Sequence, residues 1–282
     1  MCLAPLHMPP PQSTTLERRE VWKQIFTNNL KGWRAEVGML SPVATMFREY
    51  EVVAPEGIRF SRALLGLKEV TPEALRKMAE NIPSESEKLC IGHKPDLICL
   101  GCTSGSFVGG PGYDQTIIKK IEGATGVPAT TTSTSLLVTF QDLGIKKIAM
   151  CGPYLKEVFD VAIDFLKHYG IETLHLEYLG YNKSEEFWEY HHNPYPVYKL
   201  IRDCHKAAPN ADCIFISCMW SRILGIVDEV EEEIGKPVIS SCNAVLYNIL
   251  KMLGIPDTVY HYGALLQRPR LGTGAKKKAA TR

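Results

Sequence analysis

A seven-residue pattern occurs twice along the chain, and this repeat restricts the folds that the chain can adopt. Asp96-Leu-Ile-Cys-Leu-Gly-Cys102 aligns with Asp212-Cys-Ile-Phe-Ile-Ser-Cys218 at an offset of 116 residues. Two further pairs keep the same order: residues 37–42 resemble residues 148–153 at an offset of 111, and residues 125–128 resemble residues 234–237 at an offset of 109. Three blocks in register at nearly equal spacing predict two related halves.

Short apolar segments alternate with helical patterns through both halves. The expected strands span 35–40, 58–63, 96–100, 145–150, 173–178, 213–217 and 238–239. The expected helices span 71–89, 113–125, 135–143, 155–169, 196–208, 221–234 and 244–253, and Thr71-Pro72 is a typical helix start. This order predicts an α/β fold with two pseudo-symmetric lobes, each a mostly parallel sheet flanked by helices, with the active site between them.

The two lobes are expected at 34–134 plus 236–265 and at 135–235. Residues 1–33 are expected to form an N-terminal extension, and residues 266–282, which contain three consecutive lysines, a basic disordered tail. The start of the chain lacks the pattern of a secretion signal, and no apolar run is long enough to cross a membrane. The net charge of +1 leaves no electrostatic footprint for nucleic acid or a membrane surface, so neither is expected as a partner.

Nine cysteines without a secretion signal predict reduced thiols in the cytoplasm. The motif Cys99-Leu-Gly-Cys102 lacks the second pair or nearby histidines of a zinc site, and its first cysteine lies inside an expected strand rather than at a helix start. No metal is therefore expected. Most other cysteines are expected to be small buried residues: Cys90, Cys99, Cys151, Cys204, Cys213 and Cys242. His191 and His192 are expected in a loop, on the surface or at a subunit contact.

The repeat gives two of the cysteines equivalent positions. Cys102 and Cys218 each follow the carboxyl end of an expected strand, where parallel sheets bind ligands. If the lobes face each other, the two thiols flank one cleft from opposite sides. Taken alone, Cys102 also fits a small core residue. Tyr154 likewise ends a strand, and its hydroxyl enters the cleft or its ring packs at a helix start.

With these residues identified, the chain resembles the aspartate/glutamate racemase superfamily over residues 34–262. The most specific element is Cys102-Thr-Ser-Gly-Ser-Phe-Val-Gly-Gly110, followed by Gly126-Val-Pro-Ala-Thr-Thr-Thr-Ser-Thr134, Cys151-Gly-Pro-Tyr154 and Ile216-Ser-Cys218. This combination is most similar to the branch that contains maleate cis-trans isomerases, ectoine-utilisation proteins and arylmalonate decarboxylases. The presence of both thiols matches the isomerases and racemases, because the decarboxylase keeps only the second.

The resemblance implies an enzyme that needs no cofactor and acts on a small carboxylate. Its main form is an isomerase or racemase, similar to maleate cis-trans isomerase, with Cys102 and Cys218 as the catalytic pair. One alternative is an arylmalonate-type decarboxylase in which Cys218 donates a proton, and another is a ligand-binding relative without turnover. Relatives also imply a homodimer or larger homo-oligomer. The implied substrate contacts are Thr103, Ser104, Tyr154, Thr45, Ala44, Met219 and Trp220.

Two positions depart from the family patterns. In the loop Ser41-Pro-Val-Ala-Thr45, Ala44 takes the place of an asparagine that helps maleate isomerases hold a carboxylate. Met219 and Trp220 follow the second cysteine, where the decarboxylase has two glycines. The first departure counts against maleate as the substrate, and the second implies a substrate that is larger or more apolar than maleate.

Overall fold

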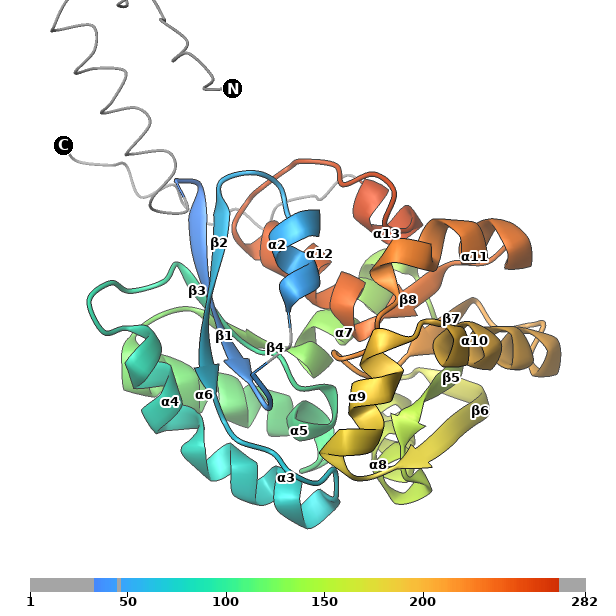
Figure 1. Ribbon diagram of the computed structural model, residues 1–282, viewed down its shortest axis with the longest axis horizontal. Coiled ribbons are helices and arrows are strands. Elements are labelled where there is room, and N and C mark those ends of the chain that lie inside the picture. Colours follow the sequence, from blue (N-terminus) through green and yellow to red (C-terminus); the bar gives the residue numbers. More distant parts are fainter. Residues whose placement is uncertain (1–32, 45–46, 269–282) are drawn as a thin grey trace, which may run out of the picture.

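Two four-stranded parallel sheets form the framework of the computed structural model, which describes residues 33–44 and 47–268 (Figure 1). The first sheet has the order β2-β1-β3-β4 and the second the order β6-β5-β7-β8, so the two halves repeat one topology. The strands are β1 Ala35–Ser41, β2 Ile58–Leu64, β3 Leu97–Leu100, β4 Ala129–Thr131, β5 Lys147–Tyr154, β6 Glu172–Tyr181, β7 Cys213–Ile216 and β8 Val238–Ser240. The predicted fold class is confirmed.

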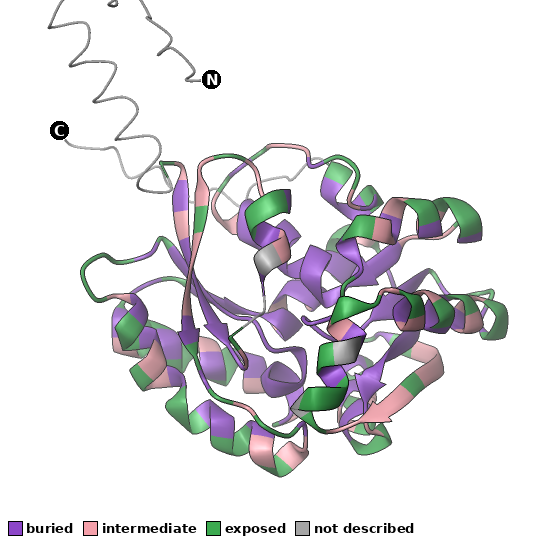
Figure 2. Ribbon diagram, in the orientation of Figure 1, coloured by how far each residue is buried: buried purple, intermediate pink, exposed green. Residues whose placement is uncertain are grey.

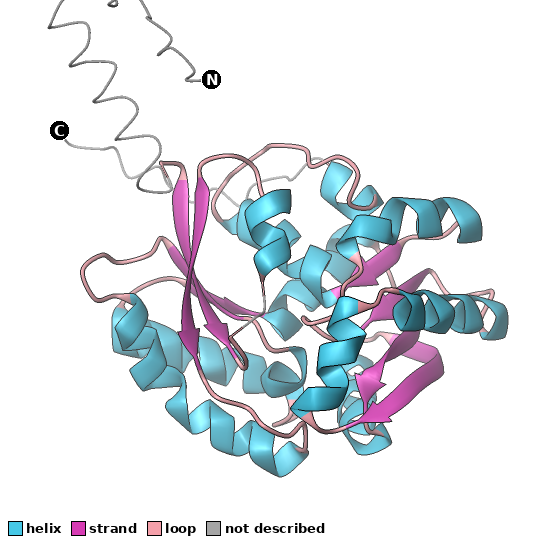
Figure 3. Cartoon of the chain, viewed as in Figure 1, coloured by secondary structure: helices cyan, strands magenta, loops and turns pink. Residues whose placement is uncertain are grey.

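Helices surround both sheets, as Figure 3 shows by secondary structure. Those of the first half are α2 Arg48–Val53, α3 Pro72–Met78, α4 Ile82–Leu89, α5 Thr103–Phe107, α6 Tyr113–Thr125 and α7 Thr132–Leu143, with a 3₁₀ turn at Ala79–Asn81. Those of the second half are α8 Lys156–His168, α9 Ser184–His192, α10 Tyr195–Ala207, α11 Val227–Ile234, α12 Ser241–Met252 and α13 Ala264–Gln267, with a 3₁₀ turn at Leu224–Ile226. No helix in the described part of the chain is long and apolar enough to cross a membrane.

Several local expectations were wrong. The single helix expected at 71–89 is two helices joined by the 3₁₀ turn, because Pro83 falls at the start of α4, where its missing N–H interrupts the ladder of hydrogen bonds. The predicted cap is confirmed, since Thr71 accepts the N–H of Ala74. His191 and His192 end helix α9 instead of lying in a loop. The three-residue strand β4 is too short for a periodic pattern to reveal it.

The two lobes are joined by helices α7 and α12, which pack against each other between the sheets (Figure 1). Phe140 of α7, which follows the first sheet, makes an edge contact with Phe215 of β7 at 5.7 Å between ring centroids. Asn248 of α12, which follows the second sheet, donates to Thr130 of β4 at 3.1 Å. Residues 241–250 are all buried, as the purple colour of α12 in Figure 2 shows. Each half therefore contributes one helix to the junction.

Part of the expected domain division was wrong. Residues 236–265 were assigned to the first lobe, but β8 pairs with β7 and so lies in the second sheet. The helix after it does contact the first lobe. Leu266 is fully buried in α13, so the chain is still folded where the tail was expected to begin. The rest of the expected extension and tail, at 1–32 and 269–282, lies outside the described residues.

Candidate active site

Cys102 lies where β3 ends and the short helix α5 begins. It is the N-cap of α5, and its sulfur accepts the N–H of Gly105 at 3.3 Å. A Cβ atom on residue 105 would stand 2.9 Å from that sulfur, so any larger residue there would displace the thiol. The hydroxyl of Ser104 lies 3.9 Å from the same sulfur. No acceptor in the described part of the chain takes the N–H groups of Thr103 and Ser104, so both remain available to a ligand.

Cys218 holds the equivalent place after β7. Its sulfur accepts the N–H of Trp220 at 3.3 Å, but the chain continues as a turn instead of a helix. At the offset of the repeat, Met219 and Trp220 correspond to Thr103 and Ser104. At these two positions the first half therefore brings hydroxyls to the site, whereas the second half brings large apolar side chains.

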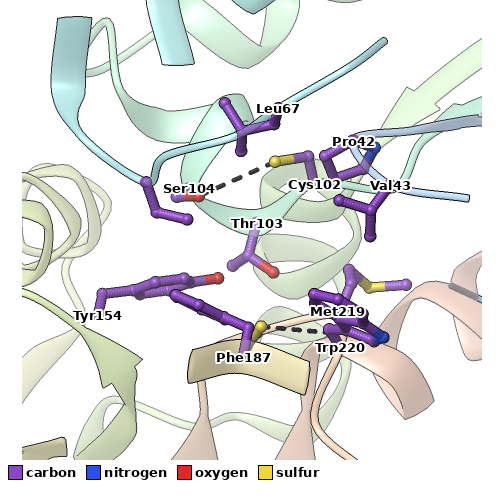
Figure 4. A pocket seen from close by; sticks show the side chains of 12 residues that line it. Pro42, Val43, Leu67, Cys102, Thr103, Ser104, Tyr154, Phe187, Met219 and Trp220 are labelled. Carbon is purple, nitrogen blue, oxygen red and sulfur yellow. Dashed lines mark hydrogen bonds between the residues drawn. The ribbon is translucent and has the colours of Figure 1, made fainter. Parts of the chain in front are cut away.

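Both thiols line one cavity, shown in close-up in Figure 4. Its volume is about 40 Å³. The side chains that line it are Pro42, Val43, Leu67, Val70, Cys102, Thr103, Ser104, Tyr154, Phe187, Cys218, Met219 and Trp220. None of these described residues is an arginine, lysine or histidine, so an anion would be held by hydroxyls and N–H groups alone.

Tyr154, at the end of β5, presents its hydroxyl to the cavity beside Thr103 in Figure 4. The hydroxyl of Tyr154 interacts with the thiol of Cys218, whose pKa it lowers, and with Ser104. Its ring packs on Phe159 and Phe187, with centroid distances of 5.4 and 5.9 Å. The hydroxyl therefore has a fixed position between the two halves of the site.

Burial dominates the acidity of the two thiols and raises the pKa of each to about 11. For Cys102, the N–H of Gly105 and the hydroxyl of Ser104 oppose this rise. For Cys218, the hydroxyl of Tyr154, the N–H of Trp220 and Ser221 oppose it. Both groups are therefore thiols near neutral pH, and more hydrogen-bonding groups oppose the rise at Cys218 than at Cys102.

The structure brings together seven of the nine residues expected in the site. Ala44 is exposed and does not line the cavity, and Thr45 lies outside the described residues. Phe187 was missed, because it comes from α9 and no motif marks it. Pro42, Val43, Leu67 and Val70 were missed too, although the first two belong to the loop that carries Ala44.

The other described cysteines lie outside the cavity. Cys99 lies inside β3, where burial raises the pKa of its thiol. Five of the six cysteines expected to be core residues are buried, whereas Cys90 is half-buried. Among the described residues, no group of three or more histidine, cysteine or acidic side chains is placed to hold a metal ion.

Comparison with known proteins places these features in context. The sequence model of the family described as arylmalonate decarboxylase matches residues 37–266. A maleate isomerase of Geobacillus stearothermophilus is 25% identical over 82% of this chain and 96% of its own. The arylmalonate decarboxylase of Bordetella bronchiseptica is 27% identical over 77% of this chain and 90% of its own. A solved structure of the maleate isomerase Iso from Pseudomonas putida S16 is 25% identical, covers 83% of this chain and 98% of its own, and superposes with a TM-score of 0.75.

Proposed function

Because the chain belongs to the arylmalonate decarboxylase family, we propose that it is a cofactor-independent isomerase or racemase of a small carboxylate, with Cys102 and Cys218 as its catalytic pair. The observation that carries this proposal is that two buried thiols from equivalent strand ends line one cavity. A single thiol is enough to protonate a carbanion. Two thiols facing one cavity suit reactions that need a base or nucleophile on one side and an acid on the other.

The carboxylate of the substrate binds at the start of α5. Thr103 and Ser104 offer N–H groups and hydroxyls there, and the hydroxyl of Tyr154 lies beside Thr103 in Figure 4. Charge delocalised onto the carboxylate during the reaction strengthens these hydrogen bonds. By analogy with oxyanion holes, each well-placed donor contributes about 2.7–4 kcal/mol to the transition state.

In the isomerase reaction, Cys102 first loses its proton to solvent, and its thiolate adds to one carbon of an activated double bond. The carbon–sulfur bond forms, the π electrons move onto the carboxylate as an enediolate, and the remaining single bond rotates. The thiol of Cys218 protonates the neighbouring carbon and later takes that proton back, and the carbon–sulfur bond then breaks to give the other geometry. The racemase reaction uses the same pair: one thiolate removes the proton α to the carboxylate, and the other thiol returns a proton to the opposite face.

A specific observation favours a second candidate, a decarboxylase of a substituted malonate. With a pKa of about 11, Cys218 stays protonated at neutral pH, as a proton donor to an enediolate must. The apolar side chains Phe187, Met219 and Trp220 form part of the cavity wall and would contact a nonpolar substituent favourably. In this reaction the carbon–carbon bond breaks, carbon dioxide leaves, and the proton of Cys218 moves to the carbon.

One experiment separates the candidates. The protein is incubated in deuterated water with maleate, substituted maleates, α-substituted carboxylates and arylmalonates, and each is followed by NMR. Isomerisation or α-deuteration without carbon dioxide release supports the first candidate, and carbon dioxide release the second. Tight binding without any exchange would instead indicate a ligand-binding protein.

Substitution of the thiols completes the test. Cys102→Ala and Cys218→Ala should each abolish isomerisation or racemisation, whereas decarboxylation should depend on Cys218 alone. Cys213→Ala is the matched control. Cys213 is a buried cysteine of β7, the strand that leads to Cys218, but it does not line the cavity. An active Cys102→Ala isomerase would refute the two-thiol mechanism. The expected homo-oligomer and cytoplasmic location stay predictions, to be tested by light scattering and cell fractionation.

A further inference from the structure

A buried serine outside the proposed catalytic set touches both halves of the site. Ser241 is the first residue of α12 and is fully buried. Its Oγ accepts the hydroxyl of Thr103 at 2.9 Å and the N–H of Cys218 at 3.3 Å. It also donates to the carbonyl of Ile216 at 3.4 Å. One hydroxyl thus connects the anion-binding hydroxyls of the first half with the backbone of the second thiol.

The repeat provides an internal comparison. At the offset of 109 residues, Thr132 of α7 corresponds to Ser241, and its hydroxyl donates to the carbonyl of Leu100 at 3.1 Å. This bond matches the one from Ser241 to Ile216. Within the described residues, however, no hydrogen bond joins the Thr132 hydroxyl to the N–H of Cys102 or to the opposite half. Ser241 therefore has bonds to Thr103 and to the N–H of Cys218 that the equivalent residue of the other half lacks.

The direction of the bonds matters for Thr103. A hydroxyl carries one proton, and Thr103 donates its proton to Ser241, so this proton is unavailable to an anion in the cavity. The bond from Ser241 to Ile216 is long and therefore weak, so it is easily given up. If Ser241 turns its own proton to the Oγ of Thr103, the proton of Thr103 is released toward the cavity.

We propose that Ser241 is a positioning residue that reverses its hydrogen bond with Thr103 when a carboxylate binds, and that fixes the backbone of Cys218 at the same time. The hydroxyl of Ser241 then donates to that of Thr103, which donates to the carboxylate. In such a chain of hydrogen bonds, each bond polarises the next. The proposal rests on the proposed function, because it assumes a carboxylate beside Thr103. It adds a residue on which both the anion site and the position of the second thiol depend.

A test that needs no natural substrate compares iodoacetate with iodoacetamide as labels. In either case a thiolate attacks the methylene carbon, the carbon–sulfur bond forms and iodide leaves. Only iodoacetate carries a carboxylate for the anion site. The labelling rates of Cys102 and Cys218 are measured separately by peptide mass spectrometry, and the ratio of the iodoacetate rate to the iodoacetamide rate reports use of that site. Thr103→Val serves as the positive control, because it removes the hydroxyl that contacts the anion.

In the wild-type protein the ratio at both thiols should exceed that of a free thiol. Ser241→Ala should lower the ratio by about 10-fold or more, as expected when a buried hydrogen-bonding group loses its partner. Thr132→Val should leave it unchanged, and Ser241→Thr should restore it. If Ser241→Ala does not fold, Ser241→Val is compared with Ser241→Thr, since the two have nearly the same shape and differ in the hydroxyl.

The outcomes distinguish the two proposals. A wild-type protein without preference for iodoacetate would refute the carboxylate site itself, and with it the proposed function. A wild-type preference that is lost in Thr103→Val but kept in Ser241→Ala would overturn only the role of Ser241. Equal losses in Ser241→Ala and Thr132→Val would also overturn it, because they would show a general effect of removing a buried hydroxyl.

Discussion

Replacing Tyr154 with phenylalanine should raise the pKa of Cys218 and slow the reaction of its thiolate. The hydroxyl of Tyr154 is the largest of the hydrogen-bonding influences that lower this pKa. The substitution removes that hydroxyl but keeps a ring that packs on Phe159 and Phe187. The fold should therefore be retained, and the change should be confined to the chemistry of the thiol.

The size of the effect follows from the bond that is lost. A hydrogen bond to a charged group contributes about 1.5–3 kcal/mol, and about 1.4 kcal/mol corresponds to one pH unit of pKa. The pKa of Cys218 should therefore rise by about one to two pH units, and the thiolate fraction should fall about 10- to 100-fold at any pH below the pKa. A more basic thiolate is also more nucleophilic, with a Brønsted coefficient of about 0.4–0.5, which recovers about half of the loss on a logarithmic scale. The net expectation is labelling of Cys218 by iodoacetamide that is about 3- to 10-fold slower.

The assay follows labelling of the Cys218 peptide between pH 7 and pH 10, with turnover of any active carboxylate measured in parallel. Tyr178→Phe is the matched control, because its ring lies 6.2 Å from that of Phe159 but its side chain does not line the cavity. A Tyr154→Phe protein that labels at the wild-type rate throughout this range would refute the claim that the hydroxyl stabilises the thiolate. A slower rate that also appears in Tyr178→Phe would show a general disturbance of the aromatic cluster.

Three further predictions concern acidity, close packing and the junction between the lobes. Since both thiols have a pKa of about 11, a reaction that needs a thiolate should accelerate about tenfold per pH unit from pH 7 to pH 10, whereas decarboxylation with Cys218 as acid should stay flat in a pH–rate profile. Gly152→Ala places a Cβ 2.5 Å from the carbonyl oxygen of Ser217, so it should destabilise the fold by about 2 kcal/mol or more and slow turnover by moving Cys218, as thermal unfolding and kinetics would show. Asn248→Leu removes hydrogen bonds of 3.1 Å to Thr130 and Ser135 and should lower the free energy of unfolding by about 2–4 kcal/mol, measured by urea titration. A decrease below about 0.5 kcal/mol would contradict the role of Asn248 in joining the two lobes.

The repeat made most of the framework predictable, because parallel strands between helices leave a regular apolar pattern. Strand β4 escaped prediction, since three residues give no period and Thr130 and Thr131 read as loop or cap residues. The two thiols and Tyr154 could be found because each ends a strand. Phe187 could not, because its place depends on how α9 lies across the cavity. Ser241 gave no sign either, since a serine at a helix start is ordinarily read as a cap.

The packing of α7 against α12 also bears on how a chain with two similar halves can arise. Each half of the protein contributes one of the two helices that pack against each other, so a half-length chain would expose the apolar face of its own helix to water. Two identical half-length chains would cover these faces by packing the helices against each other about a twofold axis. A duplicated and fused gene would preserve this arrangement in one polypeptide, and the two equivalent cysteines, once related by an exact axis, would be free to take different neighbours. The contrast between Thr103-Ser104 and Met219-Trp220 is then the record of that divergence.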